Sequence, residues 1–336
     1  MTTPTRPSLG IPLSRQRRAF LSVVCLALLL AAGRPATQQA PSMAALGTSP
    51  KPERLEVVAD GHPLSVWMKR PAAPRGAILL VHGRTWGALP NFDLRTERDD
   101  RSVMNALVRR GYATYALDQR GYGATPRDSS GWLTPTRAAR DVSIVLRWIT
   151  AREPTRGERP VLVGYSRGTA TSMLAAQLYP DSLSKLVLYA FVRDLDEKAP
   201  MATALAAPLR ERNTPTSAAS DFITRGAAPQ VVIDAYVRQA LASDPVRVDW
   251  RNEDEFNALD PSGVHVPTLL IHGAADPRAT VETDMKVLSR LGTADRSLVI
   301  LPFSDHAAHV EDVYPAWLDA IVSFIERPRE NVTGIH

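Results

Sequence analysis

One cysteine, Cys25, is the only thiol-bearing residue of the 336-residue chain, and it lies within an N-terminal apolar segment. With no second cysteine the chain forms no internal disulfide, so an oxidising compartment poses no redox problem. The sequence also lacks internal repeats, a G-x-x-x-x-G-K phosphate-binding loop and any cluster of Cys, His and carboxylate residues at metal-site spacing. We therefore expect no metal site.

Acidic residues are missing from the first 50 positions, which carry five arginines. The remainder holds 35 basic and 35 acidic residues, so the formal net charge of +5 belongs entirely to the N-terminus. A nucleic-acid surface needs basic residues gathered on the folded domain. The charge balance therefore argues against nucleic acid as a partner.

The N-terminal apolar segment, 19–32, is shorter than the roughly 20 residues that span a bilayer comfortably. Arginines at positions 15, 17 and 18 precede it, as in an export signal. Residues 17–21 also have the R-R-x-F-L form of the twin-arginine motif, which an export machinery reads. We predict an export signal over 1–33 and an exported protein, periplasmic or secreted. The alternative is an uncleaved N-terminal membrane anchor.

Strands and helices alternate along the rest of the chain. Short apolar runs predict strands at 55–59, 64–69, 77–81, 112–117, 160–163, 185–190, 268–271 and 297–301. Helical spacing and stop signals predict helices at about 97–110, 136–150, 169–179, 281–291 and 310–325. This order predicts an α/β fold with a doubly wound, mostly parallel sheet, and the Asp60-Gly61 turn adds an antiparallel edge.

The predicted domain covers 53–327, between a flexible linker at 34–52 and a C-terminal tail at 328–336. The alternation fails between about 194 and 261, a stretch rich in alanine, charge and proline that predicts several short helices. Ligands of doubly wound sheets bind beyond the carboxyl ends of the strands. We interpret 194–261 as a helical cap over such a site; a surface excursion is the alternative.

A G-x-S-x-G pentapeptide, residues 164–168, stands between a predicted strand and a predicted helix. In this position it forms a nucleophile elbow, a turn so sharp that its serine takes a strained backbone angle. Ser166 is therefore the candidate nucleophile. The alternative role is a helix N-cap, but a cap needs neither of the flanking glycines.

A serine hydroxyl needs a base, and the base needs an orienting acid. His306 and Asp276 each follow a predicted strand, and the chain order Ser, Asp, His differs from the two common protease orders. His309 competes for the role of base, and we otherwise expect it in a supporting or surface position. Asp194 is the rival acid.

Backbone N–H groups must stabilise the oxyanion of acyl transfer. One candidate donor is Arg167, directly after the nucleophile at a helix start, where the helix dipole also favours negative charge. The other is Arg84 in the loop after the strand at 77–81, with Thr85 as second choice. His82 is expected to hold that loop. Trp86 and Trp132 are possible pocket residues, although large aromatic side chains more often lie in cores.

Taken together, these residues resemble the α/β-hydrolase superfamily over about 55–327. The resemblance is carried by His82-Gly83, by the D-x-R-G-x-G segment at 118–123, by the elbow, by Gly273-Ala274-Ala275-Asp276 and by Asp305-His306. It implies the fold, a Ser-Asp-His mechanism and no cofactor. Two departures stand out: Asp305 replaces the usual glycine before the histidine, and Arg167 places a large charged residue beside the oxyanion site.

We expect a serine hydrolase that cleaves a small carboxylic ester or a related acyl compound. The superfamily also holds proline-type aminopeptidases and cofactor-free haloperoxidases, so the fold alone does not choose a substrate. An aminopeptidase needs a cap carboxylate for the substrate amine, and Asp194, Asp196, Glu197 and Asp221 are available. A non-catalytic binding protein on the same fold is the remaining alternative. The oligomeric state is not predicted.

Overall fold

The structure, a computed structural model, describes residues 50–96, 100–153, 158–201 and 207–327. The predicted export signal (1–33), nearly all of the predicted linker (34–52) and the predicted tail (328–336) lie outside the described residues and stay predictions. Within the described part of the chain, no helix is both long and apolar enough to cross a membrane.

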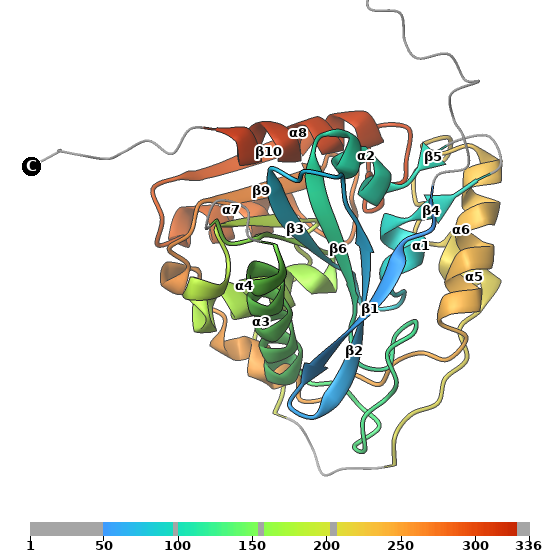
Figure 1. Cartoon of the computed structure of the whole chain (residues 1–336), viewed down its shortest axis with the longest axis horizontal. Helices are drawn as coiled ribbons and strands as arrows, with labels where there is room; N and C mark the ends of the chain where they lie inside the picture. The colour runs from blue at the N-terminus through green and yellow to red at the C-terminus, as the bar shows by residue number, and fades with distance from the viewer. Residues whose placement is uncertain (1–49, 97–99, 154–157, 202–206, 328–336) are drawn as a thin grey trace, which may run out of the picture. The chain divides into compact units, whose positions relative to one another are not determined.

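Eight strands form one sheet in the order β1-β2-β6-β3-β7-β8-β9-β10 (Figure 1). They are β1 Glu53–Ala59, β2 His62–Lys69, β3 Gly76–Val81, β6 Tyr112–Asp118, β7 Val161–Tyr165, β8 Lys185–Tyr189, β9 Thr268–Gly273 and β10 Arg296–Leu301. β1 and β2 are antiparallel to each other, β2 is antiparallel to β6, and all remaining neighbours are parallel. The predicted fold class and its antiparallel edge are confirmed.

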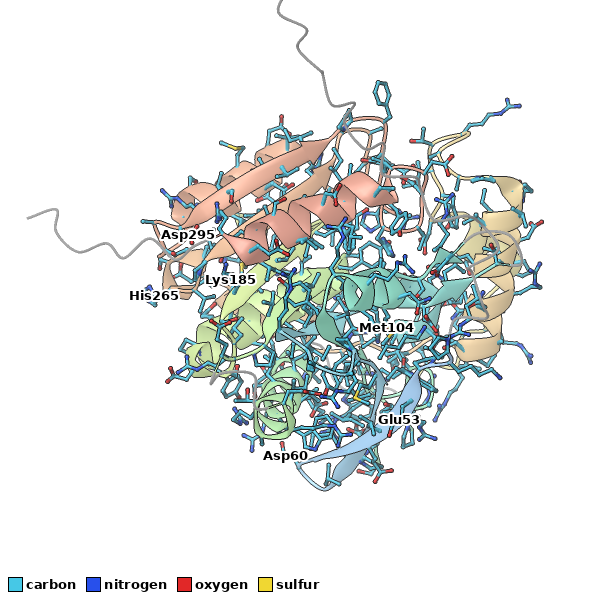
Figure 2. All side chains as sticks on the ribbon, turned by 45° about the horizontal axis from the view of Figure 1, so that its top comes forward. Glu53, Asp60, Met104, Lys185, His265 and Asp295 are labelled. Carbon is cyan, nitrogen blue, oxygen red and sulfur yellow. The ribbon has the colours of Figure 1, made fainter. Side chains whose placement is uncertain are left out.

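Helices cover both faces of the sheet (Figure 1). One face carries α3 Pro135–Arg152, α4 Arg167–Leu178 and α7 Val281–Arg290; the other carries α1 Ala88–Phe92, α2 Val103–Arg109 and α8 Tyr314–Glu326. Alternate residues of β3 serve the two faces, because successive strand side chains point in opposite directions. Leu79 packs in the cluster of α3 and α4, whereas Leu80 packs in the cluster on the other face. Met104 of α2, labelled in Figure 2, belongs to the same cluster as Leu80.

Two predicted helices begin later than the sequence pattern indicated. α2 starts at Val103 rather than near 97, because the Ser102 hydroxyl caps it by accepting the Asn105 N–H; the short strands β4 Leu94–Arg95 and β5 Asp100–Arg101 pair before it. α8 starts at Tyr314 rather than at 310. Pro315 has no N–H to give the carbonyl four residues earlier, so it fits only in the first turn.

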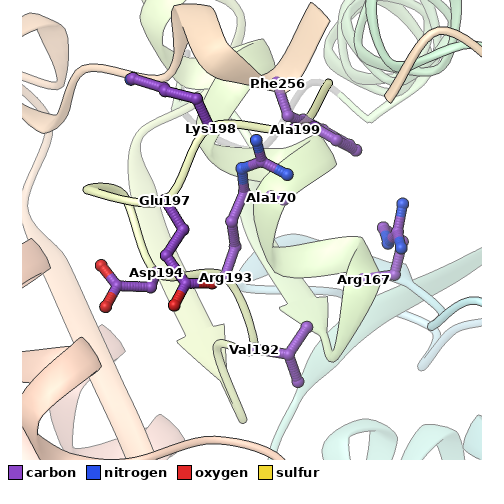
Figure 3. A pocket seen from close by; sticks show the side chains of 9 residues that line it. All are labelled: Arg167, Ala170, Val192, Arg193, Asp194, Glu197, Lys198, Ala199 and Phe256. Carbon is purple, nitrogen blue, oxygen red and sulfur yellow. The ribbon is translucent and has the colours of Figure 1, made fainter. Parts of the chain in front are cut away.

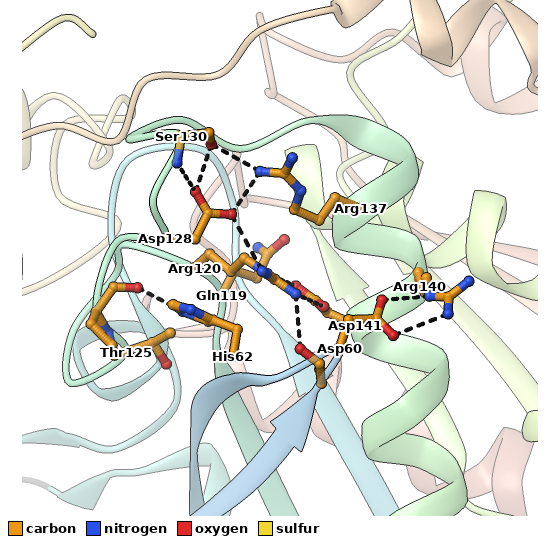
Figure 4. A network of polar contacts seen from close by, with 12 residues as sticks. Asp60, His62, Gln119, Arg120, Thr125, Asp128, Ser130, Arg137, Arg140 and Asp141 are labelled. Atoms are coloured by element: carbon orange, nitrogen blue, oxygen red, sulfur yellow. Dashed lines mark hydrogen bonds and ion pairs between the residues drawn. The ribbon is translucent and has the colours of Figure 1, made fainter.

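A buried polar network fastens the loop after β6 (Figure 4). The Arg120 guanidinium donates to both oxygens of Asp141 on α3, at 2.7 and 2.8 Å, and also to the carbonyl of Ala59 at the end of β1. The Asp128 carboxylate accepts hydrogen bonds from both Arg120 and Arg137. The arginine of the D-x-R-G-x-G segment thus joins the loop, the hairpin and the helix.

The insertion at 194–261 contains α5 Pro215–Ala219, α6 Gln230–Ser243, the 3₁₀ helix η3 Glu253–Ala258 and the start of a second, η4 Pro261–Gly263. α6 is longer than the predicted short helices. Buried residues of α5 and α6 pack with Trp86 and Leu94 from the region after β3, and with Val310 after β10. Asp244, which ends α6, accepts the Gly87 N–H at 2.7 Å and the Gly123 N–H at 2.8 Å. The insertion is therefore attached to the loops at the carboxyl edge of the sheet.

Candidate active site

Ser166 lies at the turn between β7 and α4 with φ 52° and ψ −124°, a left-handed angle that non-glycine residues rarely adopt. The flanking glycines make the turn possible. A Cβ on Gly164 would lie 2.6 Å from the Gly168 carbonyl oxygen, and one on Gly168 would lie 2.5 Å from the carbonyl oxygen of His82. The Ser166 hydroxyl makes no capping hydrogen bond to α4, so the N-cap alternative does not describe its contacts.

The structure brings Ser166, His306 and Asp276 together in one hydrogen-bonded chain. The Ser166 Oγ lies 2.8 Å from His306 Nε2, and His306 Nδ1 lies 2.7 Å from Asp276 Oδ2. Because a carboxylate only accepts, Nδ1 carries the proton, and Nε2 accepts from the serine hydroxyl. The imidazole and the carboxyl group are buried, whereas the serine is partly exposed. This is the geometry in which a base activates a nucleophile.

The loops after β9 and β10 hold the acid and the base in place. The second oxygen of Asp276, Oδ1, accepts the backbone N–H of Arg278 at 2.8 Å and that of Ala279 at 3.3 Å. Only a glycine fits at 273, because a Cβ there would overlap the backbone of Asp305. One carboxylate oxygen is thus fixed by the backbone, and the other is left for His306.

The rival residues lie elsewhere. His309 is fully buried rather than on the surface, 4.4 Å from the Tyr165 ring between ring centroids, and neither ring nitrogen has a hydrogen-bond partner among the described residues. Burial, followed by the charge of His306, lowers the pKa of His309 to about 3, so its ring is neutral. Asp194 pairs with Lys286 at 2.7 Å.

The unusual Asp305 has a structural partner in the insertion. Its carboxylate accepts the Thr224 N–H at 2.5 Å and the Ala307 N–H at 3.2 Å, while its own N–H donates to Glu311 at 3.3 Å. Burial and the neighbouring Asp305 raise the pKa of Glu311 to about 9, which keeps Glu311 protonated at neutral pH. A neutral acid beside a carboxylate can donate to it, so the pair stabilises the loop that carries His306.

Two backbone N–H groups near Ser166, those of Arg84 and Arg167, have no hydrogen-bond acceptor in the part of the chain that the structure describes. A Cβ built on Gly83 would lie 3.1 Å from the Ser166 Cβ, so the loop after β3 runs directly beside the serine. Thr85, the second-choice donor, lies on the same loop and lines a pocket together with Ser166. This loop and the start of α4 therefore flank Ser166, as an oxyanion site requires.

His82 supports that loop through two hydrogen bonds. The Gln119 N–H donates to its Nε2 at 3.2 Å, so its Nδ1 carries the proton and donates to the Gly83 carbonyl at 2.8 Å. Burial lowers the pKa of His82 to about 4, which keeps it neutral. The Tyr122 hydroxyl also supports this loop, because it donates to the Arg84 carbonyl and accepts from Trp250 Nε1 of the insertion.

A pocket of about 280 Å³ opens at Ser166. It is lined by Gly83, Arg84, Thr85, Trp86, Asn91, Tyr165, Ser166, Arg167, Val192, Asp221, Arg247, Arg278 and His306. Trp86 contributes to this wall, whereas Trp132 does not and packs instead against the Arg251 guanidinium, 4.4 Å from its ring centroid. Sequence reasoning missed Arg247 and Arg278, because neither belongs to a motif.

Among the described residues, no group of three potential ligands could hold a metal ion.

Comparison with known proteins assigns the chain to a class. Residues 72–312 match the family model described as serine aminopeptidase, S33. The chain belongs to this family, and it is therefore a hydrolase of the α/β-hydrolase superfamily. This agrees with the predicted fold and with the prediction of an enzyme.

Among curated proteins, the chain is similar to the 2-(acetamidomethylene)succinate hydrolase of Mesorhizobium japonicum, strain LMG 29417 / CECT 9101 / MAFF 303099. The two are 26% identical over 230 residues, which cover 64% of this chain and 79% of that protein. A serine hydrolase involved in carbazole degradation has the same fold, with a TM-score of 0.58 at 20% identity over 82% of this chain and 98% of the other. An esterase from Exiguobacterium antarcticum matches with a TM-score of 0.57 at 15% identity, over 81% and 99%.

Proposed function

We propose that the protein hydrolyses a small carboxylic ester or a related acyl compound through an acyl-enzyme on Ser166. One observation carries the proposal: Ser166 and His306 line a pocket, and they are hydrogen-bonded to each other and, through His306, to Asp276. The name of the curated relative, a hydrolase of a substituted succinate, also supports a small substrate.

In this mechanism, Ser166 Oγ bonds to the acyl carbon while His306 Nε2 accepts its proton. Asp276 remains ionised and stabilises the imidazolium that forms. The N–H groups of Arg84 and Arg167 donate to the oxyanion, a contribution of roughly 3 kcal/mol per donor to transition-state stabilisation. His306 then protonates the leaving group. Water, activated by the same histidine, releases the acid from the serine.

The proposal is tested with 4-nitrophenyl acetate hydrolysis and fluorophosphonate labelling of the wild type and Ser166→Ala. The wild type should turn over the ester and label at one site, and Ser166→Ala should do neither. Ser289→Ala, on the exposed side of α7, is the matched serine control and should behave as the wild type. Equal labelling of the wild type and Ser166→Ala would reject the assignment.

The second candidate is an aminopeptidase, and one observation favours it. Asp221 is the only carboxylate among the residues that line the Ser166 pocket, where it would face a substrate amine. However, its oxygen already binds the Arg278 guanidinium at 2.9 Å, and it also accepts the Tyr236 hydroxyl at 3.1 Å. Turnover of proline 2-naphthylamide faster than of 4-nitrophenyl acetate would favour the aminopeptidase.

Export also stays a proposal, supported by the arginines that precede the apolar segment at 19–32. Replacement of Arg17 and Arg18 by lysine should block export if the twin-arginine route is used. Mass spectrometry of the exported protein should find a mature chain that begins after the apolar segment. A chain that retains this segment and pellets with membranes would instead be anchored.

A further inference from the structure

Arginine dominates the charge of the pocket at Ser166. Four guanidinium groups line it, from Arg84, Arg167, Arg247 and Arg278, against the single carboxylate of Asp221. Arg278 and Asp221 pair with each other at 2.9 Å. The other three arginines therefore set the sign of the pocket, which is positive.

The carboxylates that pair with these three arginines do not neutralise their positive charge. Glu253 is shared, 2.9 Å from Arg84 and 2.8 Å from Arg167. Among the described residues the one ion pair of Arg247 is with the exposed Glu211, at 3.7 Å, and its guanidinium donates no hydrogen bond there. Of the four pocket arginines, Arg247 thus has the most distant carboxylate partner, which leaves the donors of its guanidinium for a ligand.

Arg84 and Arg247 also line an adjoining pocket of about 330 Å³, whose wall includes Leu209, Val248 and Trp250 of the insertion. The two arginines therefore stand where a substrate bound at Ser166 extends toward the insertion. Arg167 is less available, because it lies 5.6 Å from the ring centroids of both Trp250 and Phe256.

A third pocket has a different charge balance (Figure 3). It shares Arg167 with the serine pocket, and its Arg193 and Lys198 are accompanied by Asp194 and Glu197. Arg193 also donates to the Asn257 side chain at 2.7 Å. Its three cations face two carboxylates, whereas the serine pocket has four cations and one carboxylate, so this pocket attracts an anion less.

We propose that Arg84 and Arg247 bind a carboxylate carried by the acyl part of the substrate. The substrate class is then a half-ester or half-amide of a dicarboxylic acid. The inference rests on the proposed acyl hydrolysis and adds the charge of the substrate. Guanidinium and carboxylate groups form paired, charge-assisted hydrogen bonds, and these place the far end of the acyl chain while Ser166 attacks the near end.

The test compares two esters with the same six-carbon acyl chain, mono-4-nitrophenyl adipate and 4-nitrophenyl hexanoate. The wild type should favour the adipate ester in kcat/KM by at least about tenfold, and 0.5 M NaCl should narrow this ratio, since salt screens partly exposed charges. Arg247→Gln should lower the ratio about tenfold, mainly through a higher KM for the adipate ester. Arg193→Gln is the matched control and should keep the wild-type ratio.

Equal kcat/KM for both esters in the wild type, or an equal loss for both in Arg247→Gln, would overturn the proposal. Loss of the adipate preference in Arg193→Gln alone would place the carboxylate in the pocket of Figure 3 and overturn the assignment to Arg84 and Arg247. Absence of fluorophosphonate labelling at Ser166 would reject the acyl-enzyme itself. In that case the anion site is still tested by adipate, which should raise the melting temperature of the wild type and not that of Arg247→Gln.

Discussion

The C-terminal part of the chain contains two buried histidine–aspartate pairs. They differ in what the second ring nitrogen of the histidine contacts. His306 Nδ1 lies 2.7 Å from Asp276, and His272 Nδ1 lies 2.8 Å from Asp284. All four side chains are buried. By distance and burial alone, the two pairs are equivalent candidates for a general base with its orienting acid.

The difference lies at the other ring nitrogen. His306 hangs on the loop after β10, and its Nε2 contacts the Ser166 hydroxyl; His272 lies inside β9, where no described residue is hydrogen-bonded to its Nε2. The acids differ as well. The second oxygen of Asp276 binds two backbone N–H groups, whereas that of Asp284 has no partner among the described residues. A position beyond the strand end, rather than the pair itself, makes a histidine available for catalysis.

The largest expected effect separates the two histidines. His306→Ala should lower kcat for 4-nitrophenyl acetate by at least about a thousandfold, because the serine loses its base. His272→Ala, measured on folded protein at the same temperature, should keep kcat within about tenfold. The reverse ranking would break the comparison and move the base to β9.

Loss of the acid should cost less than loss of the base. Asp276→Asn replaces an acceptor by an amide that also donates, which favours the wrong tautomer of His306 and should lower kcat by a factor on the order of 10⁴. Asp194→Asn should leave kcat near the wild-type value, because Asp194 pairs with Lys286. Steady-state kinetics of both variants test which aspartate orients the base. A larger loss of kcat in Asp194→Asn than in Asp276→Asn would assign that role to Asp194.

The placement of the three candidate catalytic residues could be predicted from the sequence, and the reason is geometric. Ser166, Asp276 and His306 each follow a parallel strand, and the carboxyl ends of parallel strands meet at one edge, so strand prediction was enough to bring them together. The glycines at 164 and 168 are required by close backbone contacts that the motif encodes.

The insertion is different, because its residues are placed by distant contacts and not by a repeating pattern. Arg247 is positioned by a bridge between Arg212 and Val246 and by carbonyl contacts to Arg127, none of which has a sequence signature. His309 is a similar case in the core. Its aromatic neighbours Phe92, Tyr165, Tyr189 and Trp317 come from four separate elements, so its full burial was not predictable.

The pair of His272 and Asp284 is expected to contribute to the stability of the fold. His272→Ala leaves the Asp284 carboxyl group buried without its partner, which should cost about 3 kcal/mol of the free energy of unfolding. The double variant His272→Ala, Asp284→Ala should recover part of this loss, since no buried acid remains. Urea unfolding measures both, and additive losses in the double variant would show that the pair has no coupling.

A loss of about 2 kcal/mol in the free energy of unfolding is expected at His309, another buried histidine. His309→Ala should leave a cavity in the aromatic cluster while kcat stays within about threefold of the wild type. His309→Phe is the matched control, because the neutral, unpartnered ring is replaced by another aromatic ring of related shape. A thousandfold fall in kcat for His309→Phe would show that this histidine, and not His306, takes the serine proton.

The smallest expected effect is on the pH dependence of stability. It arises from Glu311, which lies beside Asp305 on the loop that carries His306, whereas His272 lies within a strand. The pKa of Glu311 is about 9 in the folded protein against an ordinary 4.5, so between these values the folded state holds a proton that the unfolded state has lost. Stability from this group is fully present below pH 4.5 and falls as pH rises toward 9, by at most about 1.4 kcal/mol from pH 7 to pH 8. Glu311→Gln keeps a donor for Asp305 but does not titrate, so urea unfolding of this variant should show a flatter dependence on pH than that of the wild type. Identical slopes between pH 7 and pH 9 would mean that Glu311 is already ionised, and the loop that carries His306 would then hold two adjacent buried charges.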